Sequence, residues 1–328
     1  MARRLSHHDQ RHFIPYPSLT PDEWQKIVDL GTFAEEHLLR KLSDDFSGSF
    51  TAFWESKLIE ALGKIGGTRS AEPLAAIADW YKENWKESRK PRVAYLTADN
   101  AMGKSIEIPE MKAYLEKAGY EFVGIQYVPL VPTSPPTTQL MWLKQNNVDL
   151  ALGVMVNPGS QPTVKEMVRL GMGPSQATKL TLGCALPSHL PVFAGAMGTL
   201  GDGFVVAGGF PPWDELSPGV KFETELQKKY HPNKWVSHSQ YMGGFLEAMI
   251  QIEALRLAMQ KVPLENLKPA DVLNHGFYQI KNLDTGGISS TPISYGPGKI
   301  EGVEKVRVDQ LQKGKVVKQG VWPLRNIH

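Results

Sequence analysis

Apolar runs and stretches of helical spacing alternate through the middle of the chain, from about residue 91 to residue 213. The runs that are typical of buried strands, rich in β-branched and aromatic residues, stand at 92–97, 121–130, 149–156, 179–186 and 203–210. Between them lie segments with helical spacing, such as the one after Pro109, where Met111 and Leu115 would share a face. This alternation predicts an α/β fold in which crossover helices connect the strands of a parallel sheet.

The pattern changes on both sides of this region. Residues 1–90 show no convincing strand and are predicted to be helical, with helices over 21–42, 50–64 and 71–87. Residues 214–298 are also predicted to be largely helical. Residues 299–328 end in a predicted hairpin that turns at Lys313 and Gly314. We therefore divide the chain into four segments, 1–90, 91–213, 214–298 and 299–328.

The longest periodic segment runs from 237 to 260. Apolar residues surround most of it, so we expect this helix to be largely buried. If its face around Phe245, Met249 and Ile252 lacked a partner within the chain, the protein would be expected to self-associate.

The composition of the chain argues against several classes of partner and site. A net charge of +2 over 328 residues, with no cluster of basic and aromatic residues, argues against nucleic acid as a partner. The single cysteine, Cys184, excludes an intrachain disulfide and a cysteine-rich metal site. No apolar run reaches the ~18 residues of a membrane span, and the first residues lack the apolar core of a secretory signal peptide. Three histidines near the start (His7, His8 and His12) fit a solvated tail better than a metal site, and we predict no cofactor.

Ligands of parallel sheets bind at the carboxyl ends of the strands. Two such ends carry neutral polar residues, at 97–100 and at 156–161. The candidate ligand-binding residues there are Asn100, Met102, Asn157, Ser160 and Gln161. Asn157 or Ser160 is also expected to cap the following helix, a role that is compatible with lining a site.

Two other functions stay open. The stretch Asp99–Ser105 is similar to a phosphate-binding loop, which would make the protein a nucleotide-using enzyme, but Ala98 stands where the loop needs its first glycine. Residues 58–80 look like one unit of a HEAT-like repeat, which would favour a helical interaction scaffold. No nucleophile motif supports an enzyme, and we expect the carboxylates of Glu107, Glu110 and Glu166 to be solvated on helices.

The order of these elements resembles the type I periplasmic solute-binding proteins, the branched-chain amino acid and amide binding group of transport receptors. The resemblance covers residues from about 71 to 322. Besides 91–171, it is carried by the stretches 194–213, 217–235, 240–258 and 293–317. It implies a periplasmic-binding-protein-like type I fold with two α/β lobes and a hinge crossed three times. It also implies a periplasmic or cell-surface location, an ABC-type membrane permease as partner, and no catalysis.

The resemblance also assigns residues. Tyr241 matches a tyrosine that family members place in the cleft, at the start of the long helix. Cys184 stands where amino-acid-binding relatives use a glutamate to pair with the ligand's ammonium group. We therefore predict an amide or an organic acid as the ligand, with Cys184 lining the cleft, and no tight binding of a free amino acid. Because residues 1–90 lack the family's strands, we expect one complete lobe and either a first lobe that is reduced or replaced by helices, or a chain that covers only part of a receptor.

Overall fold

A seven-stranded sheet forms the larger lobe of the computed structural model, which describes residues 71–185, 190–208, 211–230, 239–299, 302–325 and 327. The strands are β1 (Arg92–Ala98), β2 (Glu121–Val128), β3 (Leu150–Val154), β4 (Thr181–Ala185), β5 (Val205–Gly208), β6 (Lys305–Gln312) and β7 (Lys315–Pro323). Their order in the sheet is β2-β1-β3-β4-β5-β6-β7. The neighbours among β1 to β5 pair in parallel, which confirms the α/β fold predicted from the sequence.

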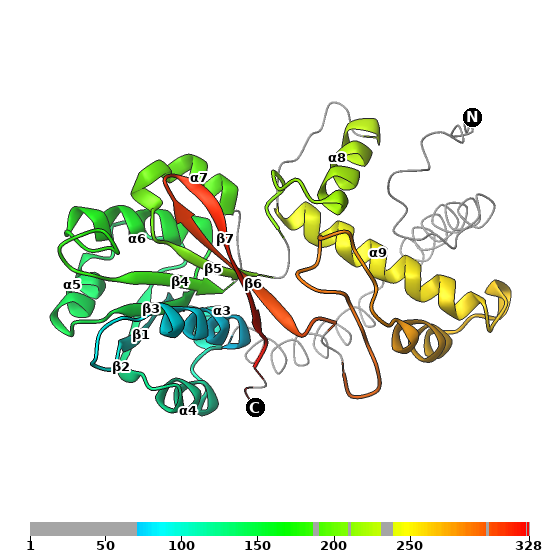
Figure 1. The fold of residues 1–328 in the computed structure, drawn as a ribbon, viewed down its shortest axis with the longest axis horizontal. Helices are drawn as coiled ribbons and strands as arrows, with labels where there is room; N and C mark the ends of the chain where they lie inside the picture. Colours follow the sequence, from blue (N-terminus) through cyan, green and yellow to red (C-terminus); the bar gives the residue numbers. More distant parts are fainter. Residues whose placement is uncertain are drawn as a thin grey trace, which may run out of the picture.

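The last two strands extend this sheet in the opposite direction. β6 pairs antiparallel with β5, and β7 pairs antiparallel with β6. The predicted hairpin turn is confirmed, since Gln312 pairs with Lys315 and the two residues between them both have positive φ. The end of the chain thus completes the sheet of the larger lobe (Figure 1).

Helices cover both faces of the sheet. In chain order they are a helix over 71–84, α3 (Ala101–Lys104), α4 (Pro109–Lys117), α5 (Thr137–Gln145), α6 (Asn157–Arg169), α7 (Leu190–Met197) and the 3-10 turn η1 (Gly198–Gly201). One hydrophobic core joins the helix 71–84 and α4 to one face, and a second core joins α5, α6 and α7 to the other. This arrangement explains why β3 and β4 are apolar at successive positions instead of alternating: all of their residues are buried.

The predicted helical face on α4 is confirmed, because Met111 and Leu115 are both fully buried in the first core. The helix predicted over 71–87 ends three residues earlier, at residue 84. The helices predicted over 21–42 and 50–64 lie outside the described residues.

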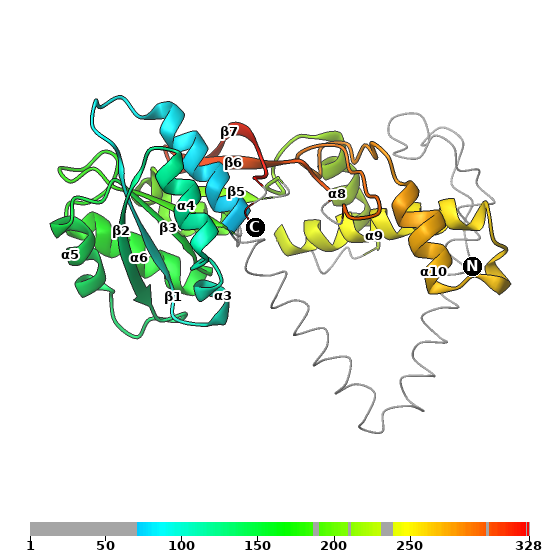
Figure 2. The ribbon, with the colours of Figure 1, turned by 90° about the horizontal axis from the view of Figure 1, so that it is seen from below.

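The remaining described elements form a second, smaller group beside the lobe (Figures 1 and 2). They are α8 (Pro218–Tyr230), α9 (Ser239–Met259), the 3-10 turn η2 (Leu264–Asn266), α10 (Pro269–Asp271), the π-helical turn η3 (Val272–Gly276) and the 3-10 turn η4 (Phe277–Gln279). In both views α9 begins near the lobe and runs away from it. Among the described residues, no helix combines the length and the apolar character that crossing a membrane requires.

The burial of α9 differs from the prediction. Met242 and Met249 are buried against Val220 and Ile288, and another side of the helix joins a separate small core. However, Tyr241 is 36% exposed, so apolar spacing all round the helix does not mean that it is buried all round. Met249 and Phe245, two residues of the face that would cause self-association if it lacked a partner, therefore pack on other parts of the chain.

Candidate functional site

The order in which the chain connects the strands reverses direction at β1, which creates a switch point between β1 and β3. From β1 the chain passes to β2 on one side, and it then returns to β3 on the other side of β1. In open α/β sheets a crevice opens outside the carboxyl ends of the strands at such a switch point, and ligands bind there. The candidate site is therefore the space beyond the carboxyl ends of β1 and β3, which we call the switch-point crevice.

The Thr97 side chain joins the two strands beyond the end of their register. Register pairs between β1 and β3 run only from Val93–Leu150 to Tyr95–Leu152. Beyond them, the fully buried Thr97 hydroxyl accepts a hydrogen bond from the Val154 backbone N–H at 3.1 Å and donates to the Gly103 carbonyl at 2.9 Å. A side chain thus takes the place of the backbone ladder where the crevice begins.

The first wall of the crevice is the turn after β1. Asn100 caps α3, its Oδ1 accepting a hydrogen bond from the Gly103 N–H at 2.7 Å. The cap uses only the carbonyl oxygen, and an asparagine side chain also has two N–H donors. Met102 is half-buried and packs on the first core. Gly103 is required here, because a Cβ at that position would lie 1.9 Å from the Ala98 carbonyl oxygen.

The second wall is the first turn of α6. This helix begins at Asn157 with Val156 in the N-cap position and no side-chain cap, so the prediction that Asn157 or Ser160 caps it is wrong. Ser160 is 3% exposed and Gln161 is half-buried. The placement of the Asn157 side chain lies outside the description. The fold thus brings this turn and the Asn100 turn to the same edge of the sheet.

The other two predicted ligand residues lie elsewhere. Cys184 points into the second core and is 1% exposed, and burial raises the pKa of its thiol to about 12. Tyr241 lies on the first turn of α9, in the smaller group of helices. The loop 186–189, which follows Cys184 and β4, lies outside the described residues.

The stretch Asp99–Ser105 does not have the geometry of a nucleotide site. The Lys104 ammonium is bound within the stretch itself, at 2.6 Å from the Asp99 carboxylate, and this bond raises the lysine pKa. A phosphate-binding loop needs that lysine for the ligand and a longer helix behind it, whereas α3 has four residues. Within the described ranges, no group of three or more histidine, cysteine, aspartate or glutamate side chains could hold a metal ion.

The expectation that Glu166 is solvated is wrong. Its side chain is 4% exposed, and it is not solvated. It accepts hydrogen bonds from the Arg169 guanidinium, both at 2.6 Å, and from the Thr137 hydroxyl. These bonds lower the pKa of the Glu166 carboxyl to about 2, and the bond with Arg169 has the largest effect. Glu166 therefore joins α6 to the start of α5, a tertiary role that only the arginine three residues later could have suggested.

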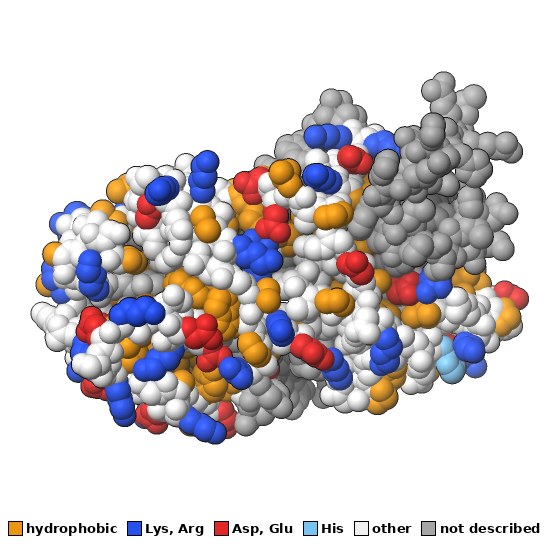
Figure 3. Space-filling view, in the orientation of Figure 1, with side chains coloured by type: hydrophobic (Ala, Val, Ile, Leu, Met, Phe, Trp, Pro, Cys, Tyr) orange, Lys and Arg blue, Asp and Glu red, His pale blue; other side chains and the backbone are white. Residues whose placement is uncertain are grey.

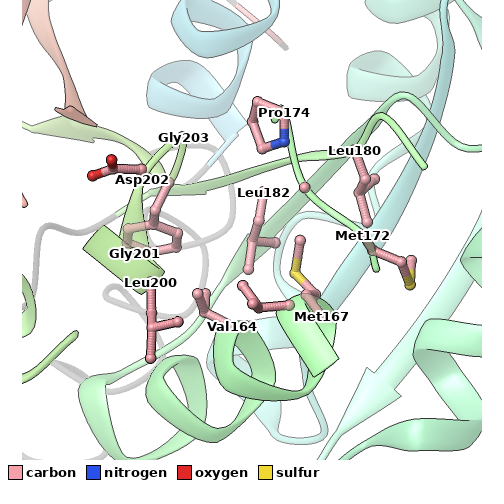
Figure 4. A pocket seen from close by; sticks show the side chains of 13 residues that line it. Val164, Met167, Met172, Pro174, Leu180, Leu182, Leu200, Gly201, Asp202 and Gly203 are labelled. Atoms are coloured by element: carbon pink, nitrogen blue, oxygen red, sulfur yellow. The ribbon is translucent and has the colours of Figure 1, made fainter. Parts of the chain in front are cut away.

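A small apolar pocket lies away from the crevice, between α6, the loop after it and η1 (Figure 4). Its lining includes Val164, Met167, Leu182 and Phe204, and its volume is about 20 Å³. That is room for about one or two water molecules, so it does not hold an organic ligand. Asp202 at its edge already accepts a hydrogen bond from the Gly314 N–H at 2.8 Å.

Comparison with known proteins agrees with the fold. The family model described as "Periplasmic binding protein" matches residues 65–287. No curated protein sequence matches the chain.

Several solved structures with a similar fold are ABC-transporter proteins. A branched-chain amino acid ABC transporter protein from Thermus thermophilus with bound valine superposes with a TM-score of 0.66 and 19% identity, over 77% of this chain and 65% of that one. An ABC-transporter substrate-binding protein from Aeropyrum pernix superposes with a TM-score of 0.64 and 16% identity, over 90% of this chain and 81% of that one. A solute-binding protein from Rhodopseudomonas palustris in complex with 3,4-dihydroxybenzoic acid superposes with a TM-score of 0.56 and 17% identity, over 80% of this chain and 66% of that one. The chain thus spans slightly less than two thirds of the Thermus protein.

Proposed function

This chain belongs to the periplasmic binding protein family, and from that premise we propose that it is a receptor that binds a small organic solute outside the cytoplasm. The family consists of substrate-binding proteins and not of enzymes. We propose an ABC-type membrane permease as the partner to which the receptor delivers its ligand. A periplasmic or cell-surface location follows from the same proposal.

The observation that carries the proposal is the pair of turns, one after β1 and one at the start of α6, that lie at the switch point of the sheet. Neutral side chains stand on both turns: Asn100 and Met102 on one, and Ser160 and Gln161 on the other. Ligand sites of this kind combine a few oriented polar groups with apolar surroundings. We propose these residues, with Asn157 and Tyr241, as ligand contacts. Cys184 stays a weaker candidate because its thiol faces the core.

The charges near the crevice support an amide or an organic acid as the ligand, in preference to a free amino acid. Asp99 is already paired with Lys104, and the loop 186–189 has the sequence Leu-Pro-Ser-His, without a carboxylate. An amino acid would bring an ammonium group, and burying that group without an anionic partner is costly. Solved relatives contain valine, benzoate or 3,4-dihydroxybenzoic acid, so the fold accommodates small organic molecules of several kinds.

Isothermal titration calorimetry tests the proposal. The full chain is titrated with leucine and valine, with benzamide and isobutyramide, and with benzoate. We expect an amide or the aromatic acid to bind and the amino acids not to bind in the micromolar range. Gln161→Ala should weaken binding, whereas the control Gln251→Ala, at an exposed position on α9, should not. Tight leucine binding would refute the ligand class, and the absence of binding by every solute would refute the receptor function.

A further inference from the structure

We propose that one internal water molecule bridges the Tyr95 hydroxyl and the Glu107 carboxylate and is a fixed part of the larger lobe. Tyr95 stands on β1, and Glu107 stands in the connection between α3 and α4. The water therefore ties the strand to the back of the turn that carries Asn100. This inference concerns the interior of the lobe and does not depend on the proposed receptor function.

The Tyr95 side chain is buried, but its hydroxyl has no protein partner. Tyr95 is 1% exposed and belongs to the first core, where its ring packs edge-on against Phe122 with the ring centroids 4.8 Å apart. Among the described residues, nothing forms a hydrogen bond with its hydroxyl. A buried hydroxyl without a hydrogen bond is costly, and folded proteins nearly always supply a partner from the chain or from ordered water.

The Glu107 carboxylate provides the matching acceptor. We expected Glu107 to be solvated, but the residue is half-buried, and its Oε1 atom is buried without a hydrogen-bond partner in the described part of the chain. Charged side chains of both signs stand on the face of the lobe that Figure 3 shows, where bulk water reaches them. The Oε1 atom of Glu107 lacks this access, so the expectation is wrong for this oxygen.

Both atoms lie on the same side of the sheet, under the connection between α3 and α4. Side chains of a strand alternate between its two faces, so Tyr95 shares a face with Thr97. On that face the Thr97 hydroxyl donates to the Gly103 carbonyl of α3 at 2.9 Å. Burial raises the pKa of the Tyr95 hydroxyl, and the charge of Glu107 raises it further. The two atoms therefore lie near each other without bonding directly.

A water molecule fits this pair better than a metal ion does. It accepts a hydrogen bond from the Tyr95 O–H and donates one to Glu107 Oε1, which satisfies both atoms at once. A hard cation needs several oxygen ligands, usually from more than one carboxylate. Within the described ranges, no group of three or more histidine, cysteine, aspartate or glutamate side chains could hold a metal ion. Because burial keeps the tyrosine protonated, Glu107 supplies the only charge of the pair.

A high-resolution crystal structure of the full chain tests the site directly. We expect one peak of water density at about 2.8 Å from both the Tyr95 hydroxyl and a Glu107 carboxylate oxygen. A direct hydrogen bond between the two side chains would overturn the proposal, and so would the absence of density between them.

Urea unfolding of Tyr95→Phe gives an independent test, because this change removes only the hydroxyl. The matched reference is Tyr120→Phe in the same core, where the hydroxyl donates to the Ala78 carbonyl at 2.6 Å. With the water in place, both variants should lower the urea midpoint by a similar amount, about 0.5 M. Removing a buried hydroxyl that bonds to nothing should not destabilise the lobe. An unchanged or higher midpoint for Tyr95→Phe would therefore overturn the proposal.

A double-mutant cycle tests whether the two side chains share one partner. Tyr95→Phe and Glu107→Ala each break the same bridge, so together they should lower the urea midpoint by clearly less than the sum of the single changes. The control cycle combines Glu107→Ala with Tyr120→Phe, at the other end of β2, and should be additive. Additive effects in both cycles would show that Tyr95 and Glu107 are not bridged.

Discussion

Replacing Thr97 by valine tests whether a side-chain hydroxyl joins the ends of β1 and β3. Valine has nearly the same shape as threonine, so the change removes the hydrogen-bonding group and leaves the packing almost unaltered. Two buried backbone groups lose their partner: the Val154 N–H, at 3.1 Å from the hydroxyl, and the Gly103 carbonyl, at 2.9 Å. Leaving a buried polar group unsatisfied costs about 1–3 kcal/mol. We therefore expect Thr97→Val to lower the free energy of unfolding by about 2–4 kcal/mol.

Thr97→Ser is the matched control. Serine keeps the hydroxyl and removes one buried methyl group, which costs about 1 kcal/mol. Equilibrium unfolding in urea, followed by far-UV circular dichroism, gives the free energy of unfolding of both variants. The values can be compared when the dependence on urea concentration, the m-value, is the same for both. Hydrogen exchange should also show faster exchange of the Val154 amide in the valine variant only. If valine is tolerated as well as serine, the hydroxyl does not hold the two strands, and our description of the crevice is wrong.

Three other residues give separate tests. The pKa of Glu166 is about 2 in the folded state and 4.5 ordinarily, so it adds stability that is fully present above about pH 4.5 and is lost as the pH falls through 2. Unfolding of Glu166→Gln, measured against pH, should therefore lack this acid-dependent loss. Cys184, with its pKa raised to about 12, should not react with a thiol reagent at pH 8 until urea is added, and rapid reaction would place it in an open crevice. The buried Asp149 carboxylate accepts hydrogen bonds from Arg89 and from the Arg92 N–H, so Asp149→Asn should cost about 3 kcal/mol in urea unfolding, and a cost below 1 kcal/mol would contradict its role as an anchor.

The strands could be predicted from the sequence because their signal is local. A buried parallel strand is a short apolar run, and each of the five runs that we identified overlaps one of the strands β1 to β5. The edge of the sheet that holds the site could also be predicted, because strand order and the position of the strand ends follow from the alternation of elements. Asn100 and Gln161 were located in this way.

The other features of the site depend on contacts between distant residues. Nothing in the sequence around Thr97 shows that its hydroxyl will bond to Val154, which is 57 residues away. The close contact of Gly159 with the Leu130 backbone, where a Cβ would lie 3.0 Å from the carbonyl oxygen, is hidden in the same way, because one glycine at a helix start has several ordinary explanations. Spacing likewise predicts which residues of a helix share a face but does not show what covers that face. This is why the burial of Glu166 was underestimated.

The chain between β5 and α8 connects the lobe to the smaller group of helices and is attached at both ends. On the lobe side, the buried Arg307 of β6 holds Glu215 at 2.5 Å while it also pairs with Asp309 of its own strand. On the other side, the Gly219 N–H donates to the Gly286 carbonyl at 2.8 Å, which fixes the start of α8. Between these two attachments stands Leu216, which is 79% exposed. Along this connection, a change in the angle between the lobe and α8 would alter the backbone around Leu216 or break the ion pair between Glu215 and Arg307.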